Sequence, residues 1–459
     1  MSIVPAQRQE TLHSVAERIQ EGRDLRRAVP RSQHAAWSPP VKRADPVQVL
    51  IETDRDRIAE LLPIRYHRMQ QSPFTFLRGA ATIMAADLAG TPTSGVMVQA
   101  CGDCHLANFG TYATPEGTPV FDINDFDETL PAPFEWDVKR LAASVATDGH
   151  SRGMADKTCR TLARMAVHGY RTEMAALCRR DPLTAWHERI DVVAALQGIE
   201  DLKLRDRELK HLHAATDAAH RGYPKLLERY NGRWRIRAHS PLIFPLAGRS
   251  DATHEIAARA AFHSYETTLP EERRVLLDRF RLSDIAFKVV GIGSVGTFCA
   301  IGLYVTADGD RLLLQIKEAG PSALAHYVGP SAYANQGERV VVGQRMTQAS
   351  PDIFLGWTSD HGDDRHCYVR QLKDQRLALL GAELADDALA HYAALCGQVL
   401  ARAHARSGDA ARIAGYMGNS GTFDAAISDF ALAYAKQTER DWRLFLEAIK
   451  SGLIEANTA

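Results

Sequence analysis

The sequence contains little cysteine, almost no net charge and no long apolar run, and each shortage excludes a class of protein. Seven cysteines in 459 residues are too few for a disulfide framework, and an odd number leaves at least one unpaired. Lys and Arg total 55 against 56 for Asp and Glu, a net charge of -1, which does not indicate a nucleic-acid or membrane-surface partner. No stretch approaches the roughly 20 apolar residues of a membrane span, and the N-terminus has no apolar signal segment. We therefore expect a cytoplasmic protein without a membrane partner.

The remaining composition is that of a globular protein. Hydrophobic residues make up 45% of the chain, which at this length supports one large core or about two to three smaller ones. We predict four segments in an α+β fold. They are an N-terminal arm over residues 1–45, a helical lobe over 46–279, a β-rich lobe over 280–378, and C-terminal helices over 379–459 that pack on the helical lobe.

Hydrophobic periodicity and turn residues predict the order of elements. The N-terminal half is expected to be mostly helical, and a β-rich block is expected between two helical stretches. The predicted elements are one short helix before residue 45, helices over 51–89 interrupted at Ser72-Pro73, a strand over 96–100, a hairpin over 109–124, helices from 136 to about 230, strands over 285–319, a helix over 332–348, strands near 353 and 368, and helices from 386.

The first dense group of polar residues follows the predicted strand at 96–100. It reads Cys-Gly-Asp-Cys-His-Leu-Ala-Asn and places Asp103 five residues before Asn108. Kinase catalytic loops use this spacing, because an aspartate takes the proton of the acceptor hydroxyl while an asparagine further along binds the metal. The spacing predicts that Asp103 is the catalytic base and Asn108 a magnesium ligand. His105 is a candidate to assist, although a structural hydrogen bond is the favoured explanation for a histidine there.

Carboxylates suited to a metal follow in Val-Phe-Asp-Ile-Asn-Asp-Phe-Asp-Glu, residues 120–128. Magnesium bridging phosphate oxygens requires hard oxygen ligands of this kind. We favour Asp122, fourteen residues after Asn108, because the predicted hairpin returns it to the loop. Asp125 and Asp127 are alternatives, since Asp-Phe-Asp looks more like the Asp-Phe-Gly motif of kinases. A solvated or calcium-type acidic turn has a similar composition.

The loop segment also matches two other patterns. Cys101-Gly-Asp-Cys-His has the spacing of c-type haem attachment, and its two cysteines alone fit a redox or zinc motif. Haem attachment of that kind accompanies export, for which the N-terminus carries no signal. A zinc site is disfavoured because no second cysteine or histidine pair stands at matching spacing. We rank both patterns below phosphate transfer.

A glycine-rich segment forms the second group of interest. Its Gly291-x-Gly293-x-x-Gly296 spacing, with Ser294 inside, occurs in dinucleotide-binding folds and in kinase phosphate loops. A dinucleotide site requires a helix after the glycines, whereas Thr297–Val305 is rich in β-forming residues. The segment therefore predicts a strand, a phosphate-covering loop and a second strand.

A single lysine ends the apolar strand that follows. Packing does not explain an ammonium group at Lys317 after Leu-Leu-Leu-Gln-Ile. In a kinase-like lobe it would contact the α- and β-phosphates and be held by a carboxylate of the next helix. Glu338, 21 residues on, is the candidate for that carboxylate, and Glu318 is a poorer one. The alternative is a lysine on a sheet edge beside a purely structural hairpin.

The two groups are complementary halves of one phosphotransfer site in reversed order. In kinases the glycine loop and lysine precede the catalytic loop, whereas here they follow it by nearly 200 residues. A circular permutation accounts for this order, because the chemistry depends on placement in space. We therefore expect a two-lobed, protein-kinase-like fold, circularly permuted so that the β-rich nucleotide lobe lies C-terminal to the catalytic loop.

Two flanking segments resemble those of aminoglycoside phosphotransferases. Residues 390–405 resemble the Leu-x-x-Leu-His helix that leads into the catalytic loop, and residues 134–144 resemble the Asp-Leu-Ala helix start after the metal aspartate. The second resemblance implies that Asp137 caps this helix and braces the catalytic loop. Arg78 and Arg140 are candidates to stabilise phosphate charge or to brace acidic loops.

Motifs spread over about residues 45–440 also resemble the bacterial domain-of-unknown-function family 2252. This resemblance names relatives without implying a substrate, so the functional interpretation depends on the residues above. The motifs are Ser-Pro-Phe-Thr-Phe-Leu-Arg-Gly at 72–79, Gly-Asp-Cys-His-Leu-Ala-Asn-Phe-Gly at 102–110, Phe-Asp-Ile-Asn-Asp-Phe-Asp-Glu at 121–128, Gly-Ile-Gly-Ser-Val-Gly at 291–296 and Gln-Ile-Lys-Glu-Ala at 315–319.

These observations predict a phosphotransferase that depends on ATP and Mg²⁺ and acts on a small-molecule or protein acceptor. A nucleotidyl transferase and a catalytically weak, nucleotide-binding pseudokinase are the alternatives. The presence of Lys317, Asp103 and Asn108 in one chain argues against the pseudokinase. The acceptor depends on the surface of the helical lobe, which no motif describes.

Overall fold

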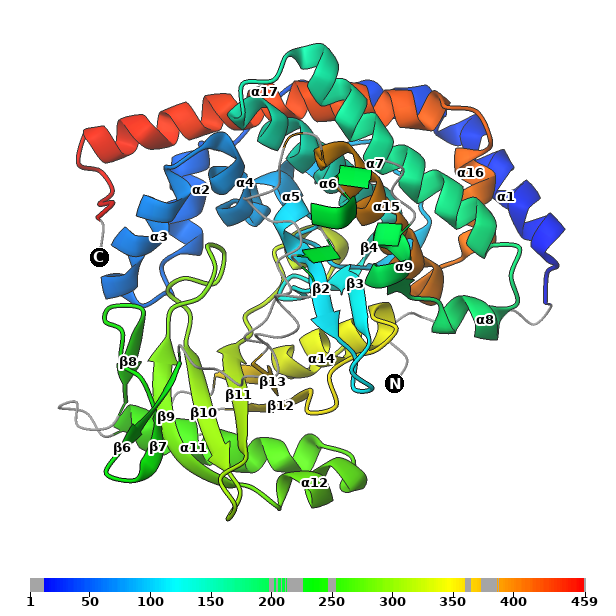
Figure 1. Cartoon of the computed structure of the whole chain (residues 1–459). Coiled ribbons are helices and arrows are strands. Elements are labelled where there is room, and N and C mark those ends of the chain that lie inside the picture. Colours follow the sequence, from blue (N-terminus) through cyan, green and yellow to red (C-terminus); the bar gives the residue numbers. More distant parts are fainter. Residues whose placement is uncertain are drawn as a thin grey trace.

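Helices and strands separate into two halves of the molecule (Figure 1). The computed structural model describes residues 12–197, 226–246, 253–359, 365–372 and 388–457, together with Asp386 and a few residues between 202 and 212. Helices from both ends of the chain gather in one half, and the largest sheet lies in the other. The predicted α+β class is confirmed.

Four long helices form the core of the helical half. The helix α6 is buried around nearly its whole circumference, with α17 and α7 packed on it and α15 packed on α7. Among the described helices, none combines the length and the apolar character that crossing a bilayer requires. Their bounds are α6 Phe134–Ser151, α7 Asp156–Leu177, α15 Leu389–Ser407 and α17 Thr422–Lys450.

The N-terminal arm packs against the C-terminal part of the chain. Its helix α1, Val15–Ala28, begins at a capping box in which the Ser14 hydroxyl and the Glu17 carboxylate each accept a backbone N–H of the other residue. This helix lies along α16, Ala410–Met417. A 3₁₀ turn at Arg31–Ala35 continues the arm over α17.

Short helices lead from the arm to the predicted catalytic loop. The Ser72 hydroxyl accepts the N–H of Thr75, and Pro73 opens the helix α4, so the predicted interruption at Ser72-Pro73 is a helix start. The helices are α2 Pro46–Thr53, α3 Leu62–Met69, α4 Pro73–Gly79 and α5 Ala81–Ala89, with a 3₁₀ turn at Ala59–Leu61.

Two small sheets flank the predicted catalytic loop. The predicted strand is β1, Met97–Ala100, and it pairs antiparallel with β4, Leu130–Pro133. The predicted hairpin is also confirmed: β2, Phe109–Ala113, pairs with β3, Pro119–Ile123, and β5, Ile190–Asp191, adds a third strand. The 3₁₀ turn Leu106–Asn108 connects the loop to β2.

The largest sheet has six antiparallel strands in the order β12-β13-β11-β10-β9-β8. Apolar side chains cover both of its faces, which explains the nearly continuous apolar runs of its central strands. The strands are β8 Ile243–Pro245, β9 Arg281–Lys288, β10 Cys299–Val305, β11 Arg311–Glu318, β12 Gly356–Ser359 and β13 His366–Gln371, and a separate hairpin joins β6 Leu227–Tyr230 to β7 Arg233–Ile236.

The β-rich half begins before residue 280, where the sequence placed its boundary. The strand β8 pairs with β9, and the helix α11 packs on the sheet through Phe262 and Tyr265. The helix α14 joins the lysine strand β11 to β12 and packs against β12 and β13. The remaining helices are α8 Pro182–His187, α9 Val192–Gln197, α11 Thr253–Tyr265, α12 Glu271–Leu277, α13 Ala325–Val328 and α14 Gln336–Thr347, with a 3₁₀ turn at Glu266–Thr268.

A buried ion triad ties the chain before α2 to α5 and α17. The Arg43 guanidinium donates two hydrogen bonds of 2.8 Å to Asp87 and bonds of 2.8 and 2.6 Å to Asp441. Asp441 is almost fully buried, so its carboxylate is stable only as part of this group.

We predict that Asp441→Ala lowers the free energy of unfolding by about 3–5 kcal/mol, because it leaves the Arg43 charge partly unpaired in the interior. Urea denaturation measures this change. The matched control is Asp429→Ala on the same helix, whose exposed ion pair with Arg160 is expected to contribute no more than about 1 kcal/mol. Equal losses in both variants would contradict a special role for the triad.

Candidate active site

The segment after β1 forms a tight loop held by the helix α6. The Asp137 carboxylate accepts the N–H of Cys101 at 2.7 Å and the N–H of Gly102 at 3.0 Å. Gly102 has φ +79°, and a side chain there would collide with the carbonyl oxygen of Glu128. The predicted bracing by Asp137 is confirmed, but the residue that precedes α6 as its cap is Pro133.

Asp103 lies at the tip of this loop, where its side chain is 19% exposed. Arg140 of α6 donates from Nε to Asp103 Oδ1 at 2.7 Å, and its Nη2 donates to the same oxygen. The second carboxylate oxygen, Oδ2, lies 3.5 Å from Nε2 of the buried His105. Burial raises the pKa of Asp103 although Arg140 opposes the shift. A raised pKa suits a carboxylate that accepts a proton near neutral pH.

Asn108 folds back onto the same loop. Its side-chain Nδ2 donates to the carbonyl of Asp103 at 2.7 Å, which directs the amide oxygen away from that carbonyl. The N–H of Asn124 donates to the carbonyl of Asn108 at 2.8 Å. The predicted base and the predicted amide ligand are therefore held next to the start of the acidic segment.

Asp127 is the carboxylate that meets the lysine of the large sheet. The Lys317 ammonium donates to Asp127 Oδ2 at 2.6 Å, the Ser294 hydroxyl donates to the same oxygen at 3.0 Å, and the Tyr368 hydroxyl donates to Oδ1 at 2.6 Å. Burial disfavours the Asp127 anion, but Lys317 and these donors hold its pKa well below its usual value. Segments nearly 200 residues apart in sequence thus meet through an ion pair between a buried lysine and a partly buried aspartate.

The three aspartates of the acidic segment have different surroundings. Asp125 borders the same cavity as Lys317, and burial together with repulsion from Asp127 raises its pKa. Asp122, which the hairpin argument favoured, lies instead by Arg406 and the N–H of Ala349, and burial raises its pKa. Asp122 lies in β3, opposite Gly110 of β2. The structure therefore groups Asp125 and Asp127, and not Asp122, with Lys317.

The expected pairing of Lys317 with Glu338 is wrong. The Lys317 carboxylate partner is Asp127, and Glu338 lies in the first turn of α14 with a less buried side chain. The adjacent residue, Arg339, points into the interior instead. Its guanidinium donates to the carbonyls of Asp127 at 2.9 Å and Thr129 at 2.6 Å. Adjacent residues of a helix point in different directions, so Arg339 faces the interior whereas Glu338 does not.

The glycine segment is a loop between antiparallel strands. Residues 289–298 connect β9 to β10, which pair with each other, and β10 then pairs with the lysine strand β11. The predicted strand–loop–strand is confirmed. The loop brings Gly291 and Ser294 to the same cavity as Lys317, while Gly293 lies beside the backbone of α4 and Gly296 beside Arg57.

A cavity of about 360 Å³ lies where the helical half, the acidic segment and the sheet meet. Its volume falls within the range of small-molecule sites. The strand end of β13, α14 and the hairpin β2–β3 also contribute to its wall. Its charged lining residues are the cations Arg68, Lys288, Lys317 and Arg370 and the carboxylates Asp125 and Asp352.

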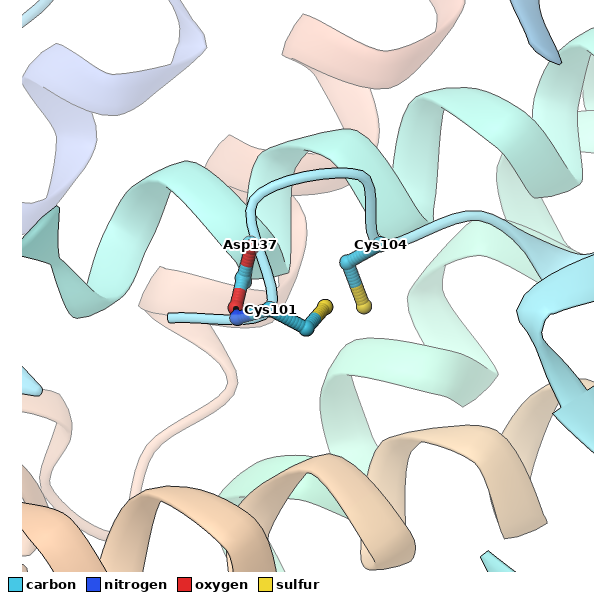
Figure 2. A group of neighbouring side chains, drawn as sticks. All are labelled: Cys101, Cys104 and Asp137. Carbon is cyan, nitrogen blue, oxygen red and sulfur yellow. Dashed lines mark hydrogen bonds between the residues drawn. The ribbon is translucent and has the colours of Figure 1, made fainter. Parts of the chain in front are cut away.

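The two loop cysteines lie side by side next to Asp137 (Figure 2). Both thiols are buried, and burial raises the pKa of each, which disfavours the thiolate that a metal or a redox partner requires. Asp137 already accepts two backbone N–H groups and lies 3.2 Å from Nε2 of His404. We therefore interpret Cys101, Cys104 and Asp137 as the packed base of the catalytic loop. Burial of both cysteines also disfavours covalent haem attachment.

Sequence reasoning missed Tyr368 and Arg370. Tyr368 lies directly opposite Lys317 in the pairing of β13 with β11, and Arg370 donates to the carbonyl of Asn124 at 3.0 Å. The sequence near these residues shows only polar side chains at alternate positions of a short strand. This pattern does not indicate which strand pairs with it. Arg78, named as a phosphate-binding candidate, lies close enough to Asp103 for its charge to oppose the rise that burial causes in the pKa of that carboxyl.

Comparison with protein families gives one match. A model of the family described as uncharacterized protein conserved in bacteria (DUF2252) matches residues 57–448. No curated protein and no solved structure matches the chain. The matched range includes the catalytic loop, the acidic segment, the glycine loop and Lys317.

We predict that Asp137→Ala loosens the catalytic loop, because two buried N–H groups lose their acceptor at about 1–3 kcal/mol each. Urea denaturation measures the loss of stability, and hydrogen exchange of peptides covering residues 101–104 measures the loosening. The control is Asp156→Ala at the exposed start of α7, which should leave exchange at the loop unchanged. Unaltered loop exchange in Asp137→Ala would show that the brace is dispensable.

Proposed function

The chain belongs to the uncharacterised bacterial family DUF2252, and we propose that it is an ATP- and Mg²⁺-dependent phosphotransferase of kinase-like type. The observation that carries this proposal is the meeting of Lys317 with Asp127 beside the glycine loop. A lysine on the third strand, a glycine-rich loop between the first two, and a metal-binding aspartate are the parts of a kinase nucleotide site. The acceptor is a small molecule or a protein.

The cavity supports the assignment of a phosphorylated nucleotide. Four cationic side chains and two carboxylates line it, so its lining favours an anionic ligand. The glycine loop and Lys317 contact the phosphates in this proposal. Asp125, Asp127 and the Asn108 amide oxygen are the hard oxygen ligands for Mg²⁺, which would neutralise charge on the phosphates.

Asp103 is assigned to the acceptor side of the reaction. Its partly exposed carboxylate accepts the proton of the acceptor hydroxyl while that oxygen bonds to the γ-phosphorus and the bond from phosphorus to the β,γ-bridging oxygen breaks. ADP leaves with the electron pair of that bond. Arg140 orients Asp103 through Oδ1, and Oδ2, which lies 3.5 Å from His105 Nε2, would accept the proton.

The order of elements supports a circularly permuted arrangement. The glycine loop, the lysine strand and α14 follow the catalytic loop in sequence, yet their side chains meet the acidic segment in space. The helix α15, which resembles the helix that leads into the loop of aminoglycoside phosphotransferases, packs beside β1 and directs His404 towards Asp137. Its C-terminal place in the chain is the place that permutation requires.

One observation favours a second candidate, a nucleotide-binding protein with weak transfer or none. Arg140 contacts Asp103 with two nitrogens, and a carboxylate held by a guanidinium is a weaker base. A nucleotidyl transferase with the same site is the third candidate. The products of the reaction distinguish them: ADP for phosphate transfer, pyrophosphate for nucleotidyl transfer, and neither for a binding protein.

We predict that the wild type binds Mg-ATP and that Lys317→Ala weakens this binding by about 10–100-fold, because a charge-assisted contact to phosphate is lost. Calorimetry measures the affinity. Asp103→Asn should instead retain binding and lower phosphate transfer from radiolabelled ATP to a metabolite pool by about 10²–10⁴-fold. Wild-type protein that binds no Mg-ATP would overturn the proposal.

The metal assignment has its own test. We predict that Asp127→Asn abolishes the Mg²⁺ dependence of ATP binding, whereas Asp122→Asn retains it, because only Asp127 lies with Lys317 and the glycine loop. Calorimetric titration of ATP with and without Mg²⁺ measures this dependence in each variant. Thermal melts confirm that both variants are folded. The reverse result would restore Asp122 as the metal ligand.

A further inference from the structure

Three arginines from the segment before α4 donate hydrogen bonds to carbonyl groups of the glycine loop. We call Arg57, Arg65 and Arg68 the arginine clamp. None of the bonds involves a side chain of the loop, so the contacts depend on how the loop backbone is turned. The clamp contacts are Arg57 Nη1 to Val295 O at 2.7 Å, Arg65 Nη1 to Ile292 O at 2.6 Å and to Gly293 O at 3.1 Å, and Arg68 Nη1 to Gly291 O at 2.5 Å.

The clamp is itself rigidly supported. Asp54 accepts from Arg65 Nε at 3.1 Å and lies 2.7 Å from Arg57 Nε. Arg65 is fully buried and also donates to the carbonyl of Gly79 at 2.8 Å. The backbone N–H of Ile58 adds a bond of 2.7 Å to the carbonyl of Gly296. A buried ion pair of this kind defines one arrangement of its neighbours, because each charge is costly without its partner.

These contacts determine where the loop amides point. In a trans peptide the carbonyl and the following N–H lie on opposite sides. Arg65 donates hydrogen bonds to the carbonyls of Ile292 and Gly293, so the N–H groups of Gly293 and Ser294 point away from Arg65. Within the described part of the chain, neither of these N–H groups donates a hydrogen bond. Two adjacent donors are therefore available to a ligand.

The side chain of Ser294 shows what lies near these amides. Its hydroxyl donates to Asp127, and Ser294 borders the cavity together with Lys317. Successive backbone N–H groups on one side of a turn form a concavity that binds anions. Arg68 borders the same cavity and is half-buried, with burial lowering its pKa. An anion in this cavity would lie next to Ser294, Lys317 and Arg68, whereas Gly293 lies beside the backbone of α4.

We propose that the arginine clamp positions the glycine loop so that the Ser294 amide, which borders the cavity beside Lys317, binds a phosphate oxygen of a nucleoside triphosphate. This inference rests on the function proposed above and assigns Arg57, Arg65 and Arg68 as positioning residues. The clamp lies outside the sheet, so the phosphate loop is preorganised by the helical half of the molecule. Preorganisation lowers the entropy cost of ordering the loop on binding.

The test compares Arg57→Ala and Arg68→Ala with the wild type, and uses Arg55→Ala, an exposed arginine in the same segment, as the matched control. We expect each clamp variant to weaken Mg-ATP and inorganic tripolyphosphate binding by about tenfold while adenosine affinity is unchanged. Arg57→Lys should recover part of the loss, because an ammonium can still donate to the Val295 carbonyl. Hydrogen exchange over residues 289–298, without ligand, should rise in the clamp variants alone.

The outcomes separate this inference from the proposed function. If the wild type binds Mg-ATP and the clamp variants bind it equally well, the clamp is not a positioning device and the proposed function stands. If loop exchange is unchanged in the variants, the clamp does not hold the loop and the inference fails. If adenosine affinity falls as much as Mg-ATP affinity, the effect is general and the inference fails as well. Wild-type protein that binds neither Mg-ATP nor tripolyphosphate overturns both.

Discussion

The ion pair between the buried Lys317 and the partly buried Asp127 joins the two halves of the molecule, and the rest of the site is arranged around it. The Lys317 ammonium is not stable alone in the interior, because an unpaired buried ion costs several kcal/mol. The hydroxyl groups of Tyr368 and Ser294 also donate hydrogen bonds to the Asp127 carboxylate, and Arg339 donates to the backbone carbonyl of Asp127. The sheet and the acidic segment therefore stabilise each other only in one relative orientation.

The helix α6 fixes the position of the loop that carries Asp103. A helix buried on all sides is normally apolar, yet α6 carries several charged residues, and each of them is hydrogen-bonded. Asp137 holds the start of the catalytic loop and Arg140 holds Asp103, while the Glu135 carboxylate accepts the N–H of Ser94. A loop fixed by a buried helix is held precisely, which the proposed transfer of a phosphoryl group to an oriented acceptor would require.

Much of this site could be predicted from the sequence because its information is local. The distance from Asp103 to Asn108 defines one loop, and both side chains remain on it. The hairpin after Asn108 follows from turn residues between short apolar runs. The strands around the glycine loop follow from β-forming residues where a helix would otherwise begin. The bracing role of Asp137 came from the resemblance of its segment to a known helix start.

The sequence by itself determined the α+β class, the loop at residues 101–108, the hairpin and the glycine loop, since hydrogen bonds between near neighbours define these elements. Only the tertiary structure decided which aspartate meets Lys317, because the direction of Asp122 depends on strand pairing and that of Glu338 on helix rotation. The sequence also did not predict the start of the β-rich half before residue 280 or the arginine clamp. Both arise from contacts between segments far apart in sequence, and periodicity carries no information about such partners.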